Sequence, residues 1–489
     1  MHQRRATRGL LAPAPAPALA LALALTAAGG CGGGEEPAFQ SPPVDQPAGW
    51  SDELALPEAI DENPDPRIVE IQLEARPASV ELLPGKPTEM WTYNGGLPGP
   101  LIRARVGDRL IVHFVNSLPE PTTIHWHGLR IQASMDGTPG HSQPEVPPGG
   151  TFEYDFVLPD AGFYWYHPHV DSAHQLGAGL YGPILVTDDD EPDLGDELLL
   201  VLADVSLEED GSLQAPDVGG PLATLFGREG TALVVNGRIR PTLRARPGLA
   251  QRWRVVNAAR SRYYQLELAG HTFARIGGDG GLSQSPKMMG RPMLTPGQRA
   301  DLVVVPQAGE EPLVLRWLPF DRGYGSTEYR PVEEVMAIEL EGDPGQPPPQ
   351  PPAVGREIEP VDTSGAEELD IALTLNPDLE VIELGINGVP SWAAEPLEAA
   401  IGDTQIWHLT NDMEWSHPFH LHGFFFQELG PGGQPALPLE WRDTLDVPYH
   451  GKASFVVRYD DRPGMWMFHC HILDHADAGM MGMLHLGVR

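Results

Sequence analysis

The chain has 489 residues, a length that predicts about two to four domains. Lys and Arg total 32 against 68 Asp and Glu, giving a formal net charge of −36. A chain this acidic repels nucleic acid and anionic membrane surfaces, so neither is expected as a partner. Its two Cys, at positions 31 and 470, are too few for a disulfide framework.

Residues 1–31 have the features of an export signal. Three Arg at positions 4, 5 and 8 precede an apolar stretch rich in Ala and Leu at residues 10–26. The segment Ala28-Gly29-Gly30-Cys31 is similar to a bacterial lipoprotein cleavage site, although Leu is usual at its first position. We therefore expect an exported lipoprotein of the periplasm or cell envelope, attached to the membrane through Cys31. The alternative is an ordinary signal peptide with an incidental Cys.

Residues 32–64 are rich in Pro, Gly and acidic side chains, which predicts a flexible tether. From residue 65 onward, one sequence unit occurs three times. Each copy contains Asn-Gly, then Pro, then Gly, and finally Asn nine residues after that Gly. The copies are Asn94-Gly95, Pro98, Gly107 and Asn116; Asn236-Gly237, Pro241, Gly248 and Asn257; and Asn387-Gly388, Pro390, Gly402 and Asn411.

A strand-like segment lies between the last Gly and Asn of each copy, at residues 110–115, 251–256 and 404–409. Short β segments separated by turn signals predict a β-sandwich for each copy. The copies divide the chain into domains at residues 65–190, 191–341 and 369–489. Residues 342–368, which include Gln346-Pro-Pro-Pro-Gln-Pro-Pro352, predict a stiff polyproline linker rather than a surface loop.

Copies one and three carry paired His residues at equivalent positions. Each copy has one His-x-His pair that starts nine residues after its last repeat Asn, and a second pair further on. The middle copy has Leu266 and Leu268 at the first of these places. Period-two spacing puts both His of a pair on one face of a strand. The pairs are His125 and His127, His167 and His169, His420 and His422, and His469 and His471.

The last pair encloses Cys470, where copy one has Pro168. His475 and Met480 follow the Cys, and His417 precedes it. One Cys, two His and a weak axial Met form the ligand set of a blue-copper electron-transfer site. Neighbours on a strand point to opposite faces, so the two His beside the Cys would face another metal site. Eight paired imidazoles suit three copper ions between copies one and three, and the other eight His are expected to have no such role.

Taken together, residues 65–489 resemble a three-domain multicopper oxidase of the laccase-like bacterial kind. The resemblance implies an all-β chain of three tandem cupredoxin-like Greek-key β-sandwich domains that hold four copper ions. It assigns His417, Cys470 and His475, with axial Met480, to the type 1 copper. It assigns His125 and His420 to the type 2 copper, and to the type 3 pair His127, His167 and His471 on one ion and His169, His422 and His469 on the other.

The resemblance also implies an enzyme that takes single electrons from a small reductant and reduces dioxygen to water. The electrons would enter at His417, the ligand expected to face solvent, and pass through Cys470 to the flanking His. Asp136 matches an acid that the family places near the type 2 copper, although Asp-Gly also suits a tight turn. Ala476 departs from the Glu that many relatives have there, so Asp136 or Asp474 is expected to supply protons.

The reductant is the least defined part of this expectation. The family includes oxidases of phenols and aromatic amines, and oxidases of Cu(I), Fe(II) or Mn(II). The 13 Met are scattered, without the Met-rich insert that copper-oxidising members often carry, so an organic reductant is expected. Trp415 could line the substrate entrance or belong to the core, and Trp441-Arg442-Asp443 resembles a structural segment. The alternatives are a metal-ion oxidase and, from another class, a periplasmic copper-binding or scaffold protein with little turnover.

Overall fold

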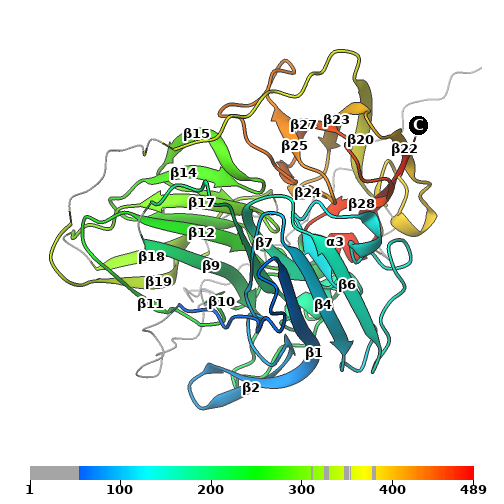
Figure 1. The fold of residues 1–489 in the computed structure, drawn as a ribbon. Coiled ribbons are helices and arrows are strands. Elements are labelled where there is room, and N and C mark those ends of the chain that lie inside the picture. The colour runs from blue at the N-terminus through cyan, green and yellow to red at the C-terminus, as the bar shows by residue number, and fades with distance from the viewer. Residues whose placement is uncertain are drawn as a thin grey trace, which may run out of the picture. The chain divides into compact units, whose positions relative to one another are not determined.

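The computed structural model describes residues 54–488 except 195, 310–311, 324–329, 346–351, 353 and 377–381. The predicted export signal, Cys31, most of the tether and the centre of the polyproline linker lie outside the described residues. Six sheets form three β-sandwich domains, in agreement with the predicted fold class (Figure 1). Within the described ranges, no helix is long and apolar enough to cross a membrane.

The first sandwich contains two four-stranded sheets, with orders β2-β1-β4-β6 and β3-β8-β7-β5. Short helices, η1 (Ala133–Met135) and α1 (Ser172–Gly177), lie in the connections. The strands are β1 (Ile68–Leu83), β2 (Lys86–Tyr93), β3 (Ile102–Arg105), β4 (Arg109–Asn116), β5 (His125–His127), β6 (Thr151–Val157), β7 (Gly162–His167) and β8 (Gly182–Thr187).

The middle sandwich packs a sheet of order β10-β9-β12-β17-β14-β15 against one of order β11-β19-β18-β13-β16. Helix α2 (Gly220–Phe226) lies between β9 and β10. The strands are β9 (Asp196–Val205), β10 (Ala232–Val235), β11 (Thr242–Ala245), β12 (Gln251–Asn257), β13 (Tyr264–Leu268), β14 (Phe273–Gly278), β15 (Gly281–Met289), β16 (Met293–Leu294), β17 (Arg299–Val304), β18 (Leu313–Leu318) and β19 (Glu333–Leu340).

The third sandwich combines sheets of order β21-β20-β23-β27-β25 and β22-β29-β28-β24-β26. Helices η3 (Ser391–Ala393) and α3 (Leu473–Asp477) connect its strands. The strands are β20 (Glu367–Leu375), β21 (Leu384–Ile386), β22 (Leu397–Ala400), β23 (Thr404–Asn411), β24 (His417–Leu421), β25 (Phe426–Leu429), β26 (Thr444–Val447), β27 (Gly451–Arg458), β28 (Gly464–Cys470) and β29 (Met481–Gly487).

The Asn-Gly motif forms the same hairpin turn in all three domains. Asn94, Asn236 and Asn387 have φ angles of 54°, 51° and 55°, and the Gly after each also has a positive φ. A two-residue turn with positive φ at both positions matches the twist of the strands on either side. Each Asn Oδ1 also accepts a backbone N–H at 2.7 Å from the first long strand of its domain. Local turn chemistry therefore explains this part of the sequence repeat.

The second repeated Asn is buried and fixes the chain that follows it. Asn116, Asn257 and Asn411 are each 0% exposed. Each Oδ1 accepts the N–H of the residue two positions later at 3.0 Å, and each Nδ2 donates to backbone carbonyls. These bonds hold the entry to the next strand in one conformation, so the residues nine positions further on occupy equivalent places in the three domains.

Those equivalent places carry His in the outer domains and apolar side chains in the middle one. His125 pairs with His167 across β5 and β7, and His420 pairs with His469 across β24 and β28. In the middle domain, Leu266 pairs with Trp317 across β13 and β18, and both side chains belong to the core. The same pair of strands therefore occurs in all three domains, and it carries His side chains in two of them.

Candidate metal centres

The ten His singled out above are all buried, none more than 5% exposed, and they form two groups. The four His-x-His pairs form the eight-His group, where strand ends of the first and third domains meet. His417 and His475 form the second group with Cys470. Of the other eight His, seven lie in the described residues and none of those is buried.

The eight-His group brings ring nitrogens from the two outer domains together. His469 Nε2 lies 3.4 Å from His169 Nε2 and 3.1 Å from His422 Nε2. His471 Nε2 lies 3.2 Å from His127 Nδ1. The rings of His127 and His420 stack with centroids 3.8 Å apart. The predicted convergence of the four pairs is therefore present.

Hydrogen bonds on the outer side of the group fix which nitrogen faces inward. The Nδ1–H groups of four imidazoles donate to backbone carbonyls, so each ring presents an unprotonated Nε2 to the interior. In the part of the chain that is described, Nε2 of His125, His167 and His420 has no hydrogen-bond partner. Lone pairs that face one another at close range repel unless a cation lies between them, so this donor set fits metal ions. The four bonds are His125 to Asp136 O (2.9 Å), His167 to Pro168 O (3.0 Å), His420 to Asp443 O (2.9 Å) and His469 to Cys470 O (2.8 Å).

Burial keeps these imidazoles in the neutral form that binds metals. It lowers the pKa of His422 to about 3 and that of His475 to about 4. Metal binding should therefore weaken only well below the ordinary His pKa of about 6.5. Burial likewise lowers the pKa of His127, His167, His169, His417, His420, His469 and His471.

Asp136 lies beside the eight-His group and is 1% exposed. Its Oδ2 is 2.8 Å from His422 Nδ1 and accepts a hydrogen bond from Thr138 Oγ1 at 2.6 Å. Its Oδ1 lies 3.4 Å from His125 Nδ1. Although burial opposes ionisation, the two imidazoles hold the pKa of Asp136 well below its usual value. An ionised carboxylate here orients two inward-facing imidazoles.

The second group has the predicted thiolate and imidazole arrangement. Cys470 Sγ lies 3.3 Å from His417 Nδ1 and 3.6 Å from His475 Nδ1, and the two nitrogens are 3.1 Å apart. His475 Nε2 donates to Leu225 O of α2 at 2.9 Å, which leaves its Nδ1 unprotonated. Burial raises the pKa of the Cys470 thiol, so a thiolate at this position requires a bound cation. Met480 is buried, and its carbonyl accepts the Cys470 N–H at 3.1 Å.

The two groups are adjacent along β28. Cys470, the last residue of β28, belongs to the second group, whereas His469 before it and His471 just after the strand belong to the eight-His group. Alternation along a strand produces this arrangement, as the sequence predicts. A few covalent bonds therefore join the two candidate centres.

Comparison with known proteins agrees with this geometry. Family models described as multicopper oxidase match residues 74–191, 202–312 and 364–486. The chain belongs to the multicopper oxidase family. It is therefore an oxidoreductase that acts on oxygen, as the sequence resemblance implies, and the His-rich groups are consistent with copper centres.

Similar multicopper oxidases include enzymes with different names. The chain is 30% identical to the multicopper oxidase MmcO of Mycobacterium tuberculosis, over 85% of this chain and 86% of that protein. It is 28% identical to a laccase of Bacillus stratosphericus, over 88% and 97% of the two chains. Among solved structures, a metallo-oxidase from Campylobacter jejuni matches with a TM-score of 0.79 and 28% identity, over 89% and 95%.

One expectation about this multicopper oxidase is wrong. His417 does not face solvent, because its side chain is 0% exposed. The Trp415 ring packs with its centroid 6.4 Å from that of His417, and α2 covers the neighbouring His475. Trp415 is itself 5% exposed, so it belongs to the core.

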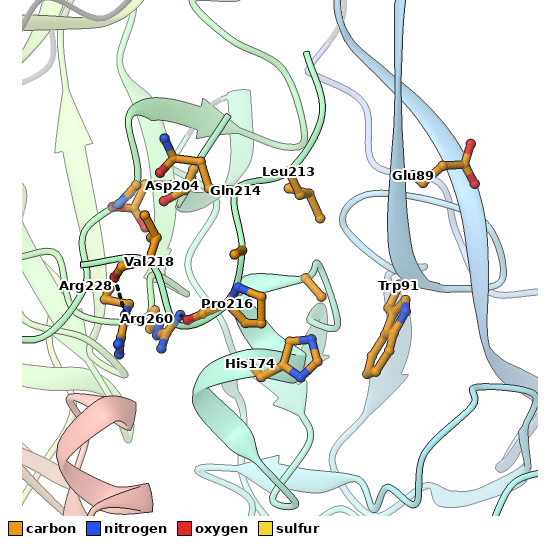
Figure 2. A pocket seen from close by; sticks show the side chains of 15 residues that line it. Glu89, Trp91, His174, Asp204, Leu213, Gln214, Pro216, Val218, Arg228 and Arg260 are labelled. Carbon is orange, nitrogen blue, oxygen red and sulfur yellow. Dashed lines mark hydrogen bonds between the residues drawn. The ribbon is translucent and has the colours of Figure 1, made fainter. Parts of the chain in front are cut away.

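Asp474 lies in an ion-pair cluster between α3 and the middle domain. Its carboxylate accepts hydrogen bonds from the Arg228 N–H at 2.9 Å, the Arg260 Nε at 2.9 Å and the Ser261 hydroxyl at 3.3 Å, and it also pairs with the Arg228 guanidinium. Arg228 and Arg260 also line a pocket whose other lining residues include Trp91 and His174 (Figure 2). These contacts place Asp474 where it holds α3, and with it His475, against the middle domain.

The sequence predicts only a structural role for Asp443, yet this residue contacts the eight-His group. Its Oδ1 lies 3.4 Å from His127 Nε2 and 3.6 Å from His420 Nδ1. Arg299 of the middle domain binds the same carboxylate through both terminal nitrogens. The segment Trp441-Arg442-Asp443 was the available signal for Asp443, whereas Arg299 lies in the copy without His pairs and had none.

Proposed function

We propose that this multicopper oxidase couples single-electron oxidation of an organic reductant, a phenol or aromatic amine, to the four-electron reduction of dioxygen to water. The observation that carries the proposal is the adjacency of the Cys470 group and the eight-His group along β28. Copper ions, when bound, would supply single-electron exchange at the first group and dioxygen reduction at the second.

The proposed ligands follow the groups that the structure brings together. His169, His422 and His469 have ligand atoms within 4.8 Å of one another, as expected for one ion of a coupled pair. His127 and His471 approach each other from the two outer domains and would hold the other ion with His167. His125 and His420 would hold the type 2 copper, and His417, Cys470, His475 and Met480 the type 1 copper.

The chain's own contribution is position and protection from water. Cys470 carries electrons along its backbone to the residues on either side, and buried imidazoles keep the lone pairs of their inner nitrogens free. Asp136 is the stronger candidate for moving protons, because its carboxylate contacts two imidazoles of the eight-His group. Asp474 is the second candidate, and its contacts are to the middle domain.

An organic reductant is supported by the laccase among the similar proteins and by the absence of a Met-rich insert from the sequence. A specific observation also favours a metal-ion reductant. Glu414 and His450 are both exposed, and His450 Nε2 lies 2.8 Å from Glu414 Oε2. Glu414 lies only three residues before His417 in the sequence. Carboxylate and imidazole are ligands for Cu, Fe and Mn ions, so a metal-ion oxidase remains the second candidate function.

Oxygen consumption by the copper-loaded protein tests these functions. The reductants should include 2,6-dimethoxyphenol, a dye-type amine, Cu(I), Fe(II) and Mn(II). We expect the two organic compounds to support the fastest uptake, and Glu414→Gln to leave those rates unchanged. Faster uptake with a metal ion, reduced by Glu414→Gln, would favour the second candidate instead. A copper-loaded protein that consumes no dioxygen with any reductant contradicts both.

Replacement of Asp136 by Asn tests the proton role. The amide keeps the shape of the side chain but cannot accept a proton and pass it on as a carboxylate can, so dioxygen reduction should slow while the blue absorption of the type 1 copper persists. Stopped-flow reoxidation of the reduced protein measures the step directly. An unchanged reoxidation rate would exclude Asp136 from proton delivery.

We also propose export and lipid attachment at Cys31, which rest on the sequence of residues 1–31. Cell fractionation tests this assignment. Wild-type protein should stay with the membrane, and Cys31→Ser should move it to the soluble fraction. Equal distribution of the two proteins would contradict lipid attachment.

A further inference from the structure

The middle domain has no His pair, yet its β16–β17 loop lies against the eight-His group. Gly297 in this loop has a φ of 87°, and a Cβ there would lie 2.8 Å from His471 Cδ2 and 3.0 Å from His127 Cε1. The Gln298 side chain donates to Thr444 O of the third domain at 3.2 Å. The middle domain therefore touches residues of both outer domains at the metal centre.

Arg299, which follows this loop at the start of β17, is 1% exposed, and both of its terminal nitrogens have acceptors. Its Nη1 donates to Asp443 Oδ1 and to Gly297 O, each at 2.9 Å, and its Nη2 binds Asp443 Oδ2 and donates to Asp279 O at 2.9 Å. Its backbone N–H donates to Asp279 Oδ1 at 2.8 Å. A planar guanidinium that binds a carboxylate through two parallel bonds fixes the orientation of that carboxylate.

The oriented carboxylate of Asp443 faces the one imidazole of the eight-His group that is turned the other way. His127 directs Nδ1, not Nε2, at His471, and its Nε2 lies 3.4 Å from Asp443 Oδ1. An imidazole that binds a metal through Nδ1 must carry its proton on Nε2. A carboxylate 3.4 Å from Nε2 favours that tautomer by electrostatic attraction, although the contact lacks hydrogen-bond geometry.

We propose that Arg299 is a positioning residue for the coupled copper pair. It clamps Asp443 so that the carboxylate selects the His127 tautomer whose Nδ1 is free to bind copper. This inference rests on the assignment of His127 as a copper ligand under the proposed function. It gives the middle domain a direct part in the metal chemistry of the outer two.

Arg299→Lys tests the proposal, because Lys keeps the positive charge and loses the two-pronged geometry. Arg252→Lys is the matched control. Arg252 is also a buried arginine of the middle domain that binds a carboxylate through two nitrogens, with Nε 3.0 Å from Asp301 Oδ1 and Nη2 2.5 Å from Oδ2. Among the described residues its carboxylate partners are Asp301, Glu191 and Glu197, and none of these belongs to either metal group.

The readouts are copper content after dialysis against a chelator, the near-ultraviolet absorption of the coupled pair and the paramagnetic resonance of the type 2 copper. Arg299→Lys should lose copper at about 10- to 100-fold lower chelator concentration and alter both spectra, with the blue absorption retained. Arg252→Lys should keep wild-type copper content and spectra. Asp443→Asn, which changes no residue of β17, should give the same spectra as Arg299→Lys. It is the alternative test if Arg299→Lys does not fold.

Copper content and spectra that are the same in Arg299→Lys, Asp443→Asn and Arg252→Lys would overturn the proposal and leave Arg299 a structural residue. That result would leave the proposed function intact if the wild-type protein shows the spectrum of a coupled pair. A wild-type protein that binds copper without that spectrum would instead remove the ligand assignment on which the inference rests.

Discussion

At the scale of single residues, the two outer domains differ at the centre of one His-x-His pair. Pro168 follows His167 at the end of β7, and Cys470 stands at the matching position of β28. Both segments place their flanking imidazoles in the eight-His group, but the Cys470 thiol also lies beside His417 and His475. Cys470 therefore connects the second group to the eight-His group.

Cys470→Ser should abolish the blue absorption and stop oxidation of the reductant, because Ser offers no thiolate to copper or to the electron path. Copper held by the eight-His group should remain, so metal analysis should show loss of the type 1 ion alone. Visible absorption, copper content and oxygen uptake measure the three effects. Cys31→Ser, which changes the other Cys, is the control and should retain the blue colour. Persistent blue absorption in the Cys470 variant would contradict the assignment.

The position and surroundings of individual residues could be predicted only where the local sequence determines them. The His pairs were found because the buried Asn of each repeat fixes the register of the following strand. The burial of His417 was not predicted, because it depends on tertiary packing: Trp415 lies beside its ring and packs in turn against Phe226 of α2 in the middle domain. The contacts of Asp443 were missed for the same reason, since Arg299 reaches it across a domain junction.

At the scale of elements, α3 is held from two sides by its two acidic residues. Asp474 binds Arg228 and Arg260 of the middle domain. Asp477 accepts backbone N–H groups at the start of α1, at 2.8 Å from Ala173 and 3.3 Å from Ser172. Because α3 carries His475 and α1 begins shortly after His169, this short helix connects the surroundings of both metal groups.

Asp474→Asn should loosen α3 and disturb the site that contains His475. Loss of one partner from a buried ion pair costs about 3–5 kcal/mol of unfolding free energy. We expect a lower thermal midpoint and a shifted or weakened blue absorption. Asp461→Asn, which changes an acid of the third domain whose side chain is 85% exposed, is the control and should leave the blue band in place. Slower dioxygen reduction with an unchanged blue band and thermal midpoint would show that Asp474 delivers protons instead.

At the scale of the whole molecule, the three repeats predicted the three sandwiches because each hairpin and each buried Asn is encoded within a few residues. The junctions between sandwiches were not predicted, because their ion pairs join residues far apart in sequence. Glu440 of the third domain is one example, with Oε2 at 2.9 Å from Arg275 Nη1 of β14. The export signal, tether and polyproline linker stay predictions, because they lie largely outside the described residues.

The Glu440 junction should make stability depend on pH in the acid range. Although burial opposes ionisation, Arg275 and Arg442 lower the pKa of Glu440 to about 2. The unfolded chain has an ordinary Glu pKa and takes up its proton first. The contribution of Glu440 is therefore complete above about pH 4.5, declines as pH falls, and is reduced by about 2 kcal/mol at pH 3.

Glu440→Gln should flatten this dependence, as measured by urea unfolding of the copper-free protein between pH 7 and pH 3. The exposed Glu398, which pairs with the exposed His485, provides the control, and Glu398→Gln should keep the wild-type slope. Equal slopes for all three proteins would show that the Glu440 junction does not contribute to acid sensitivity.

The complete burial of His417 has a consequence for the choice of reductant. Under the proposed assignment of His417 to the type 1 copper, an external donor cannot touch this imidazole, so each electron would cross a layer of side chains and backbone by outer-sphere transfer. The rate of such a transfer depends on the driving force and on how closely the donor approaches the surface. Two reductants of different shape but similar reduction potential and charge should therefore be oxidised at comparable rates. The enzyme would then discriminate among reductants by their reduction potential more than by their shape.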